Sequence, residues 1–160
     1  AMRNSFTYKS VSLAFLVDAR IGGIGVSATQ ALMDRYGVSE ASAEAREAGG
    51  VPINGGLVPA KDYYAVVGGG ATGIGAPYVY SATNVRLREA TLSYHFPAAF
   101  FRNKLKGATV GLTGKNLFMF YNKAPFDPES TASTGTYYQG IDMFRQPSYR
   151  SIGFNVSVQF

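Results

Sequence analysis

The sequence predicts an all-β fold of about five antiparallel strands from a large transmembrane β-barrel, with long extracellular loops, one containing short helices. Three observations support this prediction. The 160 residues contain only 16% charged side chains, but 14% aromatic ones and 19 glycines, which is typical of a wall with one face against lipid. Apolar and polar residues alternate along several segments, which is the period of a strand. Short and long connections alternate between those segments.

The composition also excludes several kinds of site. The absence of Cys excludes a disulfide scaffold, a thiolate metal site and a Cys nucleophile. A single histidine, His95, excludes a zinc site built from two histidines of this chain. We expect no cofactor, no metal and no transmembrane helix, since no apolar run reaches about 18 residues. The start shows no signal peptide, so we expect it to be an internal cut.

The first two strands are predicted at residues 4–8 and 11–20, joined by a tight turn at Lys9 and Ser10. In the second strand the odd-numbered positions from Val11 onward are apolar. Asp18 lies on the opposite face, so its charge need not enter lipid.

The next two strands are predicted at residues 81–96 and 108–121, and both change phase along their length. In the first of them, Val85 and Leu87 have the opposite parity to the later apolar residues. A β-bulge near Arg88 explains this change, or else both residues lie beyond the lipid belt. The second strand changes phase after Asn116.

The last strand, at residues 150–160, is the clearest, because five apolar residues alternate there with small, uncharged polar ones without exception. Two long loops remain, at residues 21–80 and 122–148. The first holds two predicted helices. One follows Ser27 as N-cap and stops at Gly37, and the other follows Ser39.

Loop lengths also predict an orientation. Outer-membrane barrels have short periplasmic turns and long extracellular loops, so the last strand runs inward toward the periplasm.

Five strands are fewer than the roughly 8 of the smallest membrane barrels, and an open sheet leaves unpaired edges in hydrocarbon. The chain is therefore expected to be either the tail of a larger barrel or a soluble protein.

Several segments resemble the SusC/RagA-type TonB-linked outer-membrane transporters. They occur in the order of that family and span nearly the whole chain: residues 15–20 with Gly22 and Gly23, residues 86–97, residues 113–118, residues 126–129, and the closing strand at residues 149–160. The departures are small. Ala19 stands where the family usually has Gly, and Lys115 where it commonly has Gln or Arg.

The resemblance implies a barrel of roughly 22 strands in the outer membrane of a Gram-negative cell, of which residues 1–160 form the C-terminal part. It implies nutrient uptake of glycans or peptides together with a SusD-like surface lipoprotein, powered by TonB. The plug domain and the TonB box are absent from this sequence. It also implies that the barrel-assembly machinery reads the last strand, at Phe154, Val156, Val158 and Phe160, and that outer-membrane lipid covers the wall.

Loop residues supply the candidate ligand contacts. The loop carboxylates Asp127, Glu129 and Asp142 could bind a cation or sugar hydroxyls, although Asp127 before a proline more often sets a turn. Tyr137 and Tyr138 could stack on a sugar ring. Most tyrosines near the loops are instead expected to form an interfacial girdle: Tyr63, Tyr64, Tyr78, Tyr80, Tyr121, Tyr137 and Tyr138.

Other functions find less support. No catalytic constellation is present, so we expect no enzyme. Residues 68–73 match G-x-G-x-x-G, but no helix follows to bind a phosphate. Arg102, Lys104 and Lys106 indicate a solvated periplasmic turn and no nucleic-acid surface. The alternative hypothesis is a soluble, secreted β-sandwich that binds carbohydrate through exposed tyrosines.

Overall fold

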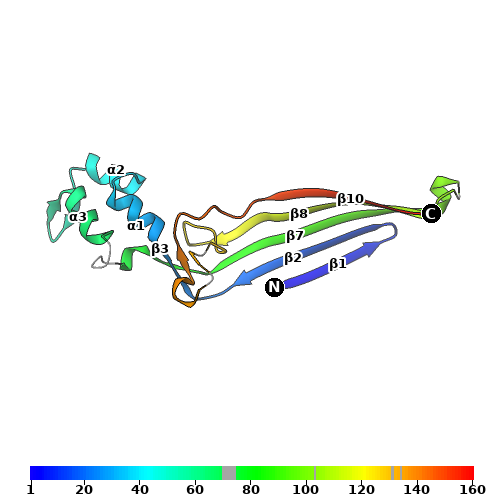
Figure 1. Cartoon of the computed structure of the whole chain (residues 1–160), viewed down its shortest axis with the longest axis horizontal. Helices are drawn as coiled ribbons and strands as arrows, with labels where there is room; N and C mark the ends of the chain where they lie inside the picture. The colour runs from blue at the N-terminus through cyan, green and yellow to red at the C-terminus, as the bar shows by residue number, and fades with distance from the viewer. Residues whose placement is uncertain (70–74, 103, 131, 134) are drawn as a thin grey trace. The chain divides into compact units, whose positions relative to one another are not determined.

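The structure of the chain is a computed structural model that describes residues 1–69, 75–102, 104–130, 132–133 and 135–160. The chain divides into two compact units (Figure 1). Unit 1 comprises Ala1–Gly22, Thr83–Lys123 and Ser148–Phe160, and unit 2 comprises Gly23–Ala82 and Ala124–Pro147.

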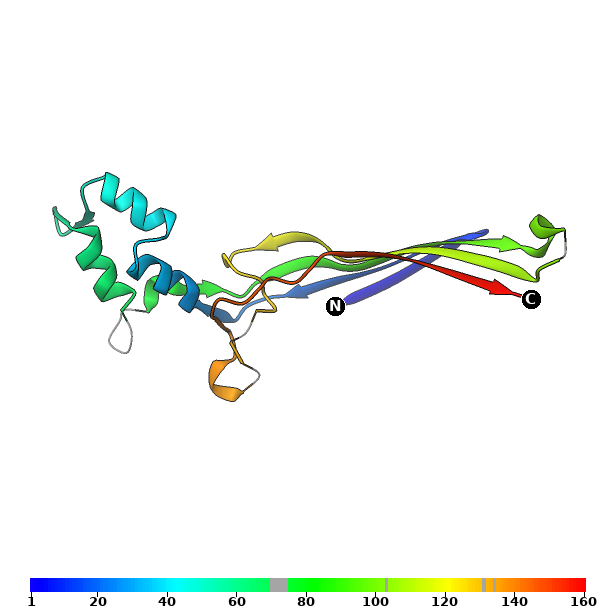
Figure 2. The same ribbon diagram turned by 45° about the horizontal axis from the view of Figure 1, so that its top comes forward.

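Unit 1 is a single sheet of five strands in the order β1-β2-β7-β8-β10, which lie side by side in both ribbon views (Figures 1 and 2). Every neighbouring pair in it is antiparallel. The strands are β1 (Met2–Tyr8), β2 (Val11–Arg20), β7 (Asn84–Pro97), β8 (Gly107–Asn122) and β10 (Ser151–Gln159). The predicted all-β class with about five antiparallel strands is confirmed.

Three register shifts interrupt the sheet. Two of them are β-bulges near its middle, and the third lies between Val85 and Arg86, where the pairing on β8 moves from Tyr121 to Met119. Arg88 of β7 is the extra residue between Leu87 and Glu89, which face consecutive residues of β2. In β8 the pairing moves from Lys115 to Phe118 while β7 moves only from Glu89 to Leu87, so β8 also carries an extra residue. Asn116, at this point, has a left-handed backbone with φ of 51°. The bulges therefore lie where the sequence pattern changes phase.

Both short connections of unit 1 lie at one end of the sheet. Lys9, with φ of 52°, and Ser10 form the turn between β1 and β2. Between β7 and β8, the 3₁₀ helix η2 (Ala98–Phe101) ends at Arg102, whose φ is 54°. A main-chain hydrogen bond of 2.8 Å from His95 N of β7 to Ser10 O joins the first turn to the neighbouring strand.

Unit 2 contains three short helices and two small sheets. In the larger sheet β3 is central, antiparallel to β6 and parallel to β9, whereas β4 and β5 form a separate hairpin. The elements are β3 (Ile24–Ser27), α1 (Ala28–Arg35), α2 (Glu40–Glu47), β4 (Val51–Ile53), β5 (Gly56–Val58), α3 (Ala60–Val67), η1 (Ala76–Tyr78), β6 (Val79–Ser81), η3 (Thr136–Tyr138) and β9 (Ile141–Asp142).

The first two helices begin as their sequences predict. The Ser27 hydroxyl accepts a hydrogen bond from Gln30 N, and the Ser39 hydroxyl accepts one from Ser42 N, each at 3.1 Å. Helix α1 ends at Arg35 with Tyr36 as its C-cap, and the next residue is Gly37, whose φ of 72° suits a residue without Cβ. The third helix, α3, was not predicted, because it follows Pro59 and has no side-chain cap.

The interior of unit 2 is small and partly polar. Its buried side chains include Ala60, Val67 and Tyr78 together with Asp34 and Asp142. The girdle interpretation is wrong for Tyr78, which is only 3% exposed. Residues 70–73 of the G-x-G-x-x-G match lie outside the described residues. No helix in the described part of the chain is long and apolar enough to cross a membrane.

Candidate membrane-facing surface and loop contacts

One face of the unit 1 sheet is apolar across all five strands. The strand registers bring its residues into cross-strand pairs: Phe154 lies opposite Leu112, which lies opposite Leu92, which lies opposite Leu13. This apolar face consists of Phe6, Tyr8, Val11, Leu13, Phe15, Val17, Leu87, Ala90, Leu92, Tyr94, Phe96, Ala108, Val110, Leu112, Phe118, Ile152, Phe154, Val156 and Val158.

The bulges keep the apolar face continuous. Without an extra residue at Arg88, the two-residue period would turn Leu87 to the other face of the sheet. With it, Leu87 pairs with Val17 of β2 and with Phe118 of β8. At both phase changes the extra residue of a bulge shifts the alternation by one position. The apolar side chains, Leu87 included, therefore stay on the same face of the sheet.

The opposite face, the polar face, consists largely of small hydroxyl and amide residues. Thr7 and Ser12 are joined by a hydrogen bond of 3.0 Å between their hydroxyl oxygens, as are Thr91 and Thr113. His95 Nδ1 lies 3.1 Å from Thr109 Oγ1. All three contacts join neighbouring strands, so the side chains stabilise the sheet across its width.

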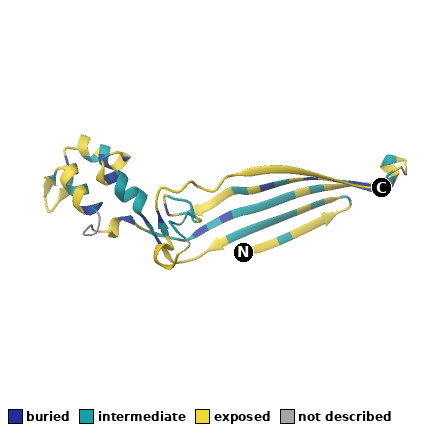
Figure 3. Cartoon of the chain, in the orientation of Figure 1, coloured by how far each residue is buried: buried dark blue, intermediate teal, exposed yellow. Residues whose placement is uncertain are grey.

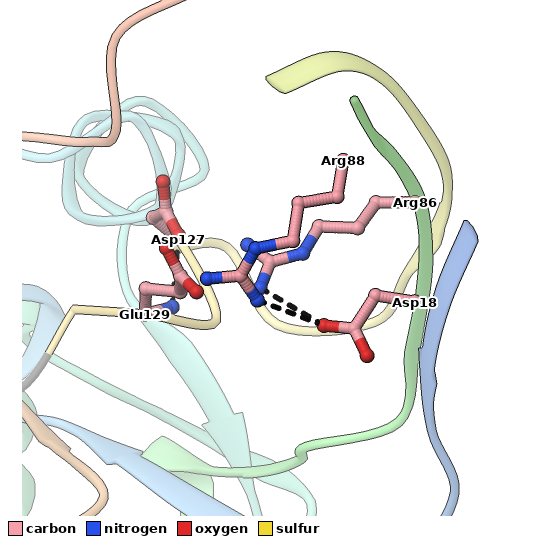
Figure 4. Close-up of polar contacts among 5 residues, drawn as sticks. All are labelled: Asp18, Arg86, Arg88, Asp127 and Glu129. Carbon is pink, nitrogen blue, oxygen red and sulfur yellow. Dashed lines mark hydrogen bonds and ion pairs between the residues drawn. The ribbon is translucent and has the colours of Figure 1, made fainter. Parts of the chain in front are cut away.

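Charges on the polar face gather beside the bulge, where two arginines meet one carboxylate (Figure 4). Arg86 Nη2 and Arg88 Nη1 each lie 3.2 Å from Asp18 Oδ2. The Arg86 side chain is buried, whereas that of Arg88 is largely open to solvent, so Arg86 forms the stronger of the two ion pairs. Asp18 thus points away from the apolar face, as its parity predicts.

The apolar face is exposed along much of its extent (Figure 3). On β10, Ile152 is 70% exposed, Phe154 82% and Val156 57%. A β-sandwich requires a second sheet over such a face. The described strands of unit 1 form one sheet only, so the sandwich alternative finds no support in this unit.

The four residues that the barrel-assembly machinery is expected to recognise lie at an edge of that sheet. Phe154, Val156 and Val158 belong to β10, which pairs with β8 along its other edge, and Phe160 follows directly after β10. All four side chains are exposed. The structure therefore places them where another strand or an assembly factor can reach them.

The predicted loop contacts all lie in unit 2. Asp127 sets a turn, because its Oδ1 accepts a hydrogen bond of 2.8 Å from Glu129 N, and its carbonyl accepts one from Ser130 N. Tyr137 and Tyr138 follow one another in η3, and Tyr137 is 92% exposed. The two tyrosine side chains are thus open to solvent, whereas the Asp127 side chain already accepts a hydrogen bond that stabilises its own turn.

A buried polar contact in unit 2 was missed by the sequence analysis. Asp142, only 4% exposed, accepts hydrogen bonds from the hydroxyls of Ser27 at 3.1 Å and Ser130 at 3.0 Å. It thereby joins the start of α1 to the second long loop. Sequence could not reveal it, since the partners are up to 115 positions apart. Among the described residues, no group of three or more His, Cys, Asp or Glu is arranged to hold a metal ion.

Unit 2 also has a cavity of about 330 Å³ between its helices, with Asp34, Arg46, Lys61 and Tyr64 in its lining. Arg46 is held in place, because its Nη1 donates a hydrogen bond of 2.9 Å to Gly37 O. Burial raises the pKa of Tyr64, and the negative charge of Asp34 raises it further. Tyr64 is therefore a neutral hydrogen-bonding group and not a base.

No model of a protein family and no curated protein matches the chain. Solved structures do match. The RagAB peptide importer in its "open-open" state is 18% identical and aligns over 96% of this chain and 16% of the solved chain, with a TM-score of 0.63. The chain has the fold of one segment of that importer. Its "closed-closed" state is also 18% identical and aligns over 99% of this chain and 17% of the solved one, with a TM-score of 0.62.

The match to the RagAB peptide importer agrees with the fold that the sequence resemblance implies. At 18% identity the likeness concerns the fold. The chain spans about a sixth of the length of the RagAB chains that it matches.

Proposed function

We propose that the chain is a part of the wall and extracellular loops of a TonB-dependent nutrient importer in the outer membrane of a Gram-negative cell. The continuous, exposed apolar face of unit 1 carries this proposal. In lipid such a face is stable, whereas in water it would favour aggregation. The fold shared with RagAB chains supports the same assignment.

The sheet also needs neighbours that the chain does not supply. The outer edges of β1 and β10 pair with no strand in the described part of unit 1. Unpaired backbone groups in hydrocarbon cost several kcal/mol each, so a membrane sheet must close into a barrel. We infer that other strands of a longer polypeptide complete the wall, since the matched RagAB chains are about six times longer.

The sheet of unit 1 would act as a barrier between lipid and the lumen of the pore, without catalysing a reaction. The apolar face meets outer-membrane lipid, and the polar face, with its paired hydroxyls, lines the lumen. Energy from TonB enters through parts of the protein outside this chain. The protein would therefore be no enzyme and would need no cofactor.

The loops of unit 2 would face the exterior, where a SusD-like surface lipoprotein and the glycan or peptide substrate arrive. Tyr137 and Tyr138 are the loop residues best placed for stacking on a substrate, because both are exposed. Asp127 and Glu129 would contribute oxygen atoms at the turn that they form.

A pair of arginine substitutions in the middle strand tests the assignment of the two faces. Leu92 and Ser93 are consecutive in β7, so they lie at the same depth but on opposite faces. In the complete barrel, Leu92→Arg places a charge in lipid and should destabilise the folded form by about 2–4 kcal/mol. Ser93→Arg places the same charge in the lumen, beside Gly111 and Ser12, and should change stability little.

The measurement is urea unfolding of the complete barrel in lipid vesicles, followed by the shift in gel mobility between folded and heated samples. Equal losses in both variants would contradict a membrane-facing apolar face. A larger loss for Ser93→Arg would indicate that the polar face is the one buried against other protein.

A further inference from the structure

Aromatic rings cluster at the end of the unit 1 sheet where the short turns lie. Tyr94 and Phe96, on the apolar face, have ring centroids 4.6 Å apart. The cluster continues into the turn, with Phe96 5.1 Å from Phe100 and Phe100 5.2 Å from Phe101. Phe100 is largely exposed. Rings gathered at one level of a membrane strand are typical of the boundary between acyl chains and headgroups.

Four exposed cations adjoin this cluster. Arg102, Lys104 and Lys106 follow it in the turn between β7 and β8, and Lys9 forms the neighbouring turn. Each turn is anchored to a strand at this end, because Lys106 N donates a hydrogen bond of 2.9 Å to Gln159 O of β10 and His95 N of β7 donates one to Ser10 O. Lys9 Nζ lies 5.4 Å from the centre of the Tyr8 ring, so this cation also borders an aromatic surface.

No acidic side chain balances these charges within the turns. The acidic side chains of unit 1 are Asp18 and Glu89. Asp18 is bound to Arg86 and Arg88, and Glu89 is paired in register with Lys115 of β8. Both lie several residues along their strands from the turns. The carboxylate of Phe160 follows Gln159 at this end, so the four cations of the turns leave a net positive charge there.

We propose that this end of the sheet, named the basic turn end (Lys9, Arg102, Lys104 and Lys106 with the adjoining rings), binds the headgroups of anionic phospholipids. The rings would fix the depth of the wall at the interface, and the cations would then lie at the level of the phosphate groups. Arg102 can donate two parallel hydrogen bonds to one phosphodiester, while the lysines add point charges. This inference rests on the proposed function, which places the short turns at the inner leaflet.

The complete barrel, reconstituted into phosphatidylcholine vesicles that contain about 30% phosphatidylglycerol, tests the proposal. Membrane patches around the protein are excised with a polymer, and their lipids are counted by mass spectrometry. We expect phosphatidylglycerol to be enriched around the wild-type protein. The triple variant Arg102→Gln, Lys104→Gln, Lys106→Gln should return the lipid ratio to that of the bulk vesicle.

A matched variant controls for net charge. Arg3→Gln, Lys115→Gln, Lys123→Gln removes three positive charges from the same unit but away from the turns, and it should keep the enrichment. Soluble glycerophosphate added to the vesicles should not displace the lipid, because the bilayer holds lipid headgroups beside the cations at a much higher local concentration than the free phosphate reaches. Displacement would assign the cations to soluble phosphate and would overturn the lipid assignment.

The possible failures are distinguishable. Enrichment retained in the turn variant, or lost equally in the control, would overturn the basic turn end as a lipid site while leaving the barrel assignment intact. Failure of the wild-type protein to insert into any vesicle would instead overturn the proposed function.

Discussion

At the scale of single residues, Tyr78 combines deep burial with an isolated hydroxyl. Its oxygen is sealed from solvent and has no hydrogen-bond partner among the described residues. Burial raises the pKa of Tyr78 above its ordinary value, and interaction with the Asp34 carboxylate raises it further. The contact with Asp34 is thus electrostatic, without the geometry of a hydrogen bond.

This burial predicts a pH dependence of unit 2. Above about pH 10 an ordinary tyrosine ionises in the unfolded chain, whereas the raised pKa keeps Tyr78 protonated in the folded one. The folded state then binds more protons, so stability falls as the pH rises beyond this value. Tyr78→Phe should lessen that fall and cost little at neutral pH, because no hydrogen bond is lost.

Thermal loss of the helical circular dichroism signal, followed from neutral to alkaline pH, measures the effect. Tyr137→Phe is the control, since that ring is almost fully exposed. A stability profile of Tyr78→Phe identical to that of wild type would show that Tyr78 does not carry the dependence.

Phe160 supports a second prediction at this scale. It follows the alternating apolar residues of β10 and is exposed. Phe160→Asp in the complete polypeptide should strongly lower the amount of assembled barrel, because a carboxylate replaces the ring that we propose the assembly machinery reads. Gln159→Asp, on the polar parity, is the control. The amount of heat-modifiable barrel in outer membranes is the readout, and wild-type levels for Phe160→Asp would refute this role.

At the scale of elements, the bulge in β8 depends on the backbone of Asn116. Its φ of 51° suits Asn or Gly and strains a β-branched residue. Asn116 Nδ2 also donates a hydrogen bond of 3.1 Å to Tyr149 O, which ties the bulge to the chain before β10.

Two substitutions of Asn116 separate the effect of backbone strain from that of the lost side-chain hydrogen bond. Asn116→Gly and Asn116→Val both remove the hydrogen bond, but only Val adds strain, so Val should cost about 1–2 kcal/mol more. Urea unfolding of the complete barrel gives the difference. Equal stabilities would mean that the bulge relaxes at no cost and does not fix the register.

The elements that sequence predicts best are those whose signal is local. The strict alternation of residues 150–160 predicts β10, and the phase change around Arg88 predicts a bulge that the structure contains. Ser27 and Ser39 likewise predict the starts of α1 and α2. Helix α3 escapes prediction because it lacks a capping side chain. The Asp142 contacts escape it because only tertiary folding brings Ser27 and Ser130 to that carboxylate.

At the scale of the whole molecule, the division into two units predicts that the wall can assemble without most of unit 2. The chain leaves and re-enters unit 1 at adjacent points, since Gly22 N donates a hydrogen bond of 3.0 Å to Thr83 Oγ1. Replacing residues 23–82 with a short Gly/Ser linker should therefore keep the complete barrel folded. Substrate uptake should fall, because the deletion removes one of the two long loops that we propose receive the substrate.

Heat-modifiable gel mobility measures folding of this deletion variant, and uptake by cells measures transport. Loss of the folded band would show that the sheet depends on unit 2. Uptake at the wild-type rate would show that residues 23–82 take no part in transport.

The paired hydroxyls of the polar face have a consequence for traffic through the proposed pore. Thr91 with Thr113, and Thr7 with Ser12, each share one hydrogen bond across the strands, which leaves one hydroxyl donor of each pair free in the described part of the chain. Because half of the hydroxyl donors in these pairs are already used, this stretch of the proposed lining offers a passing solute fewer hydrogen-bond donors than four unpaired hydroxyls would. We therefore expect discrimination between cargo molecules to depend more on parts of the pore before or beyond it.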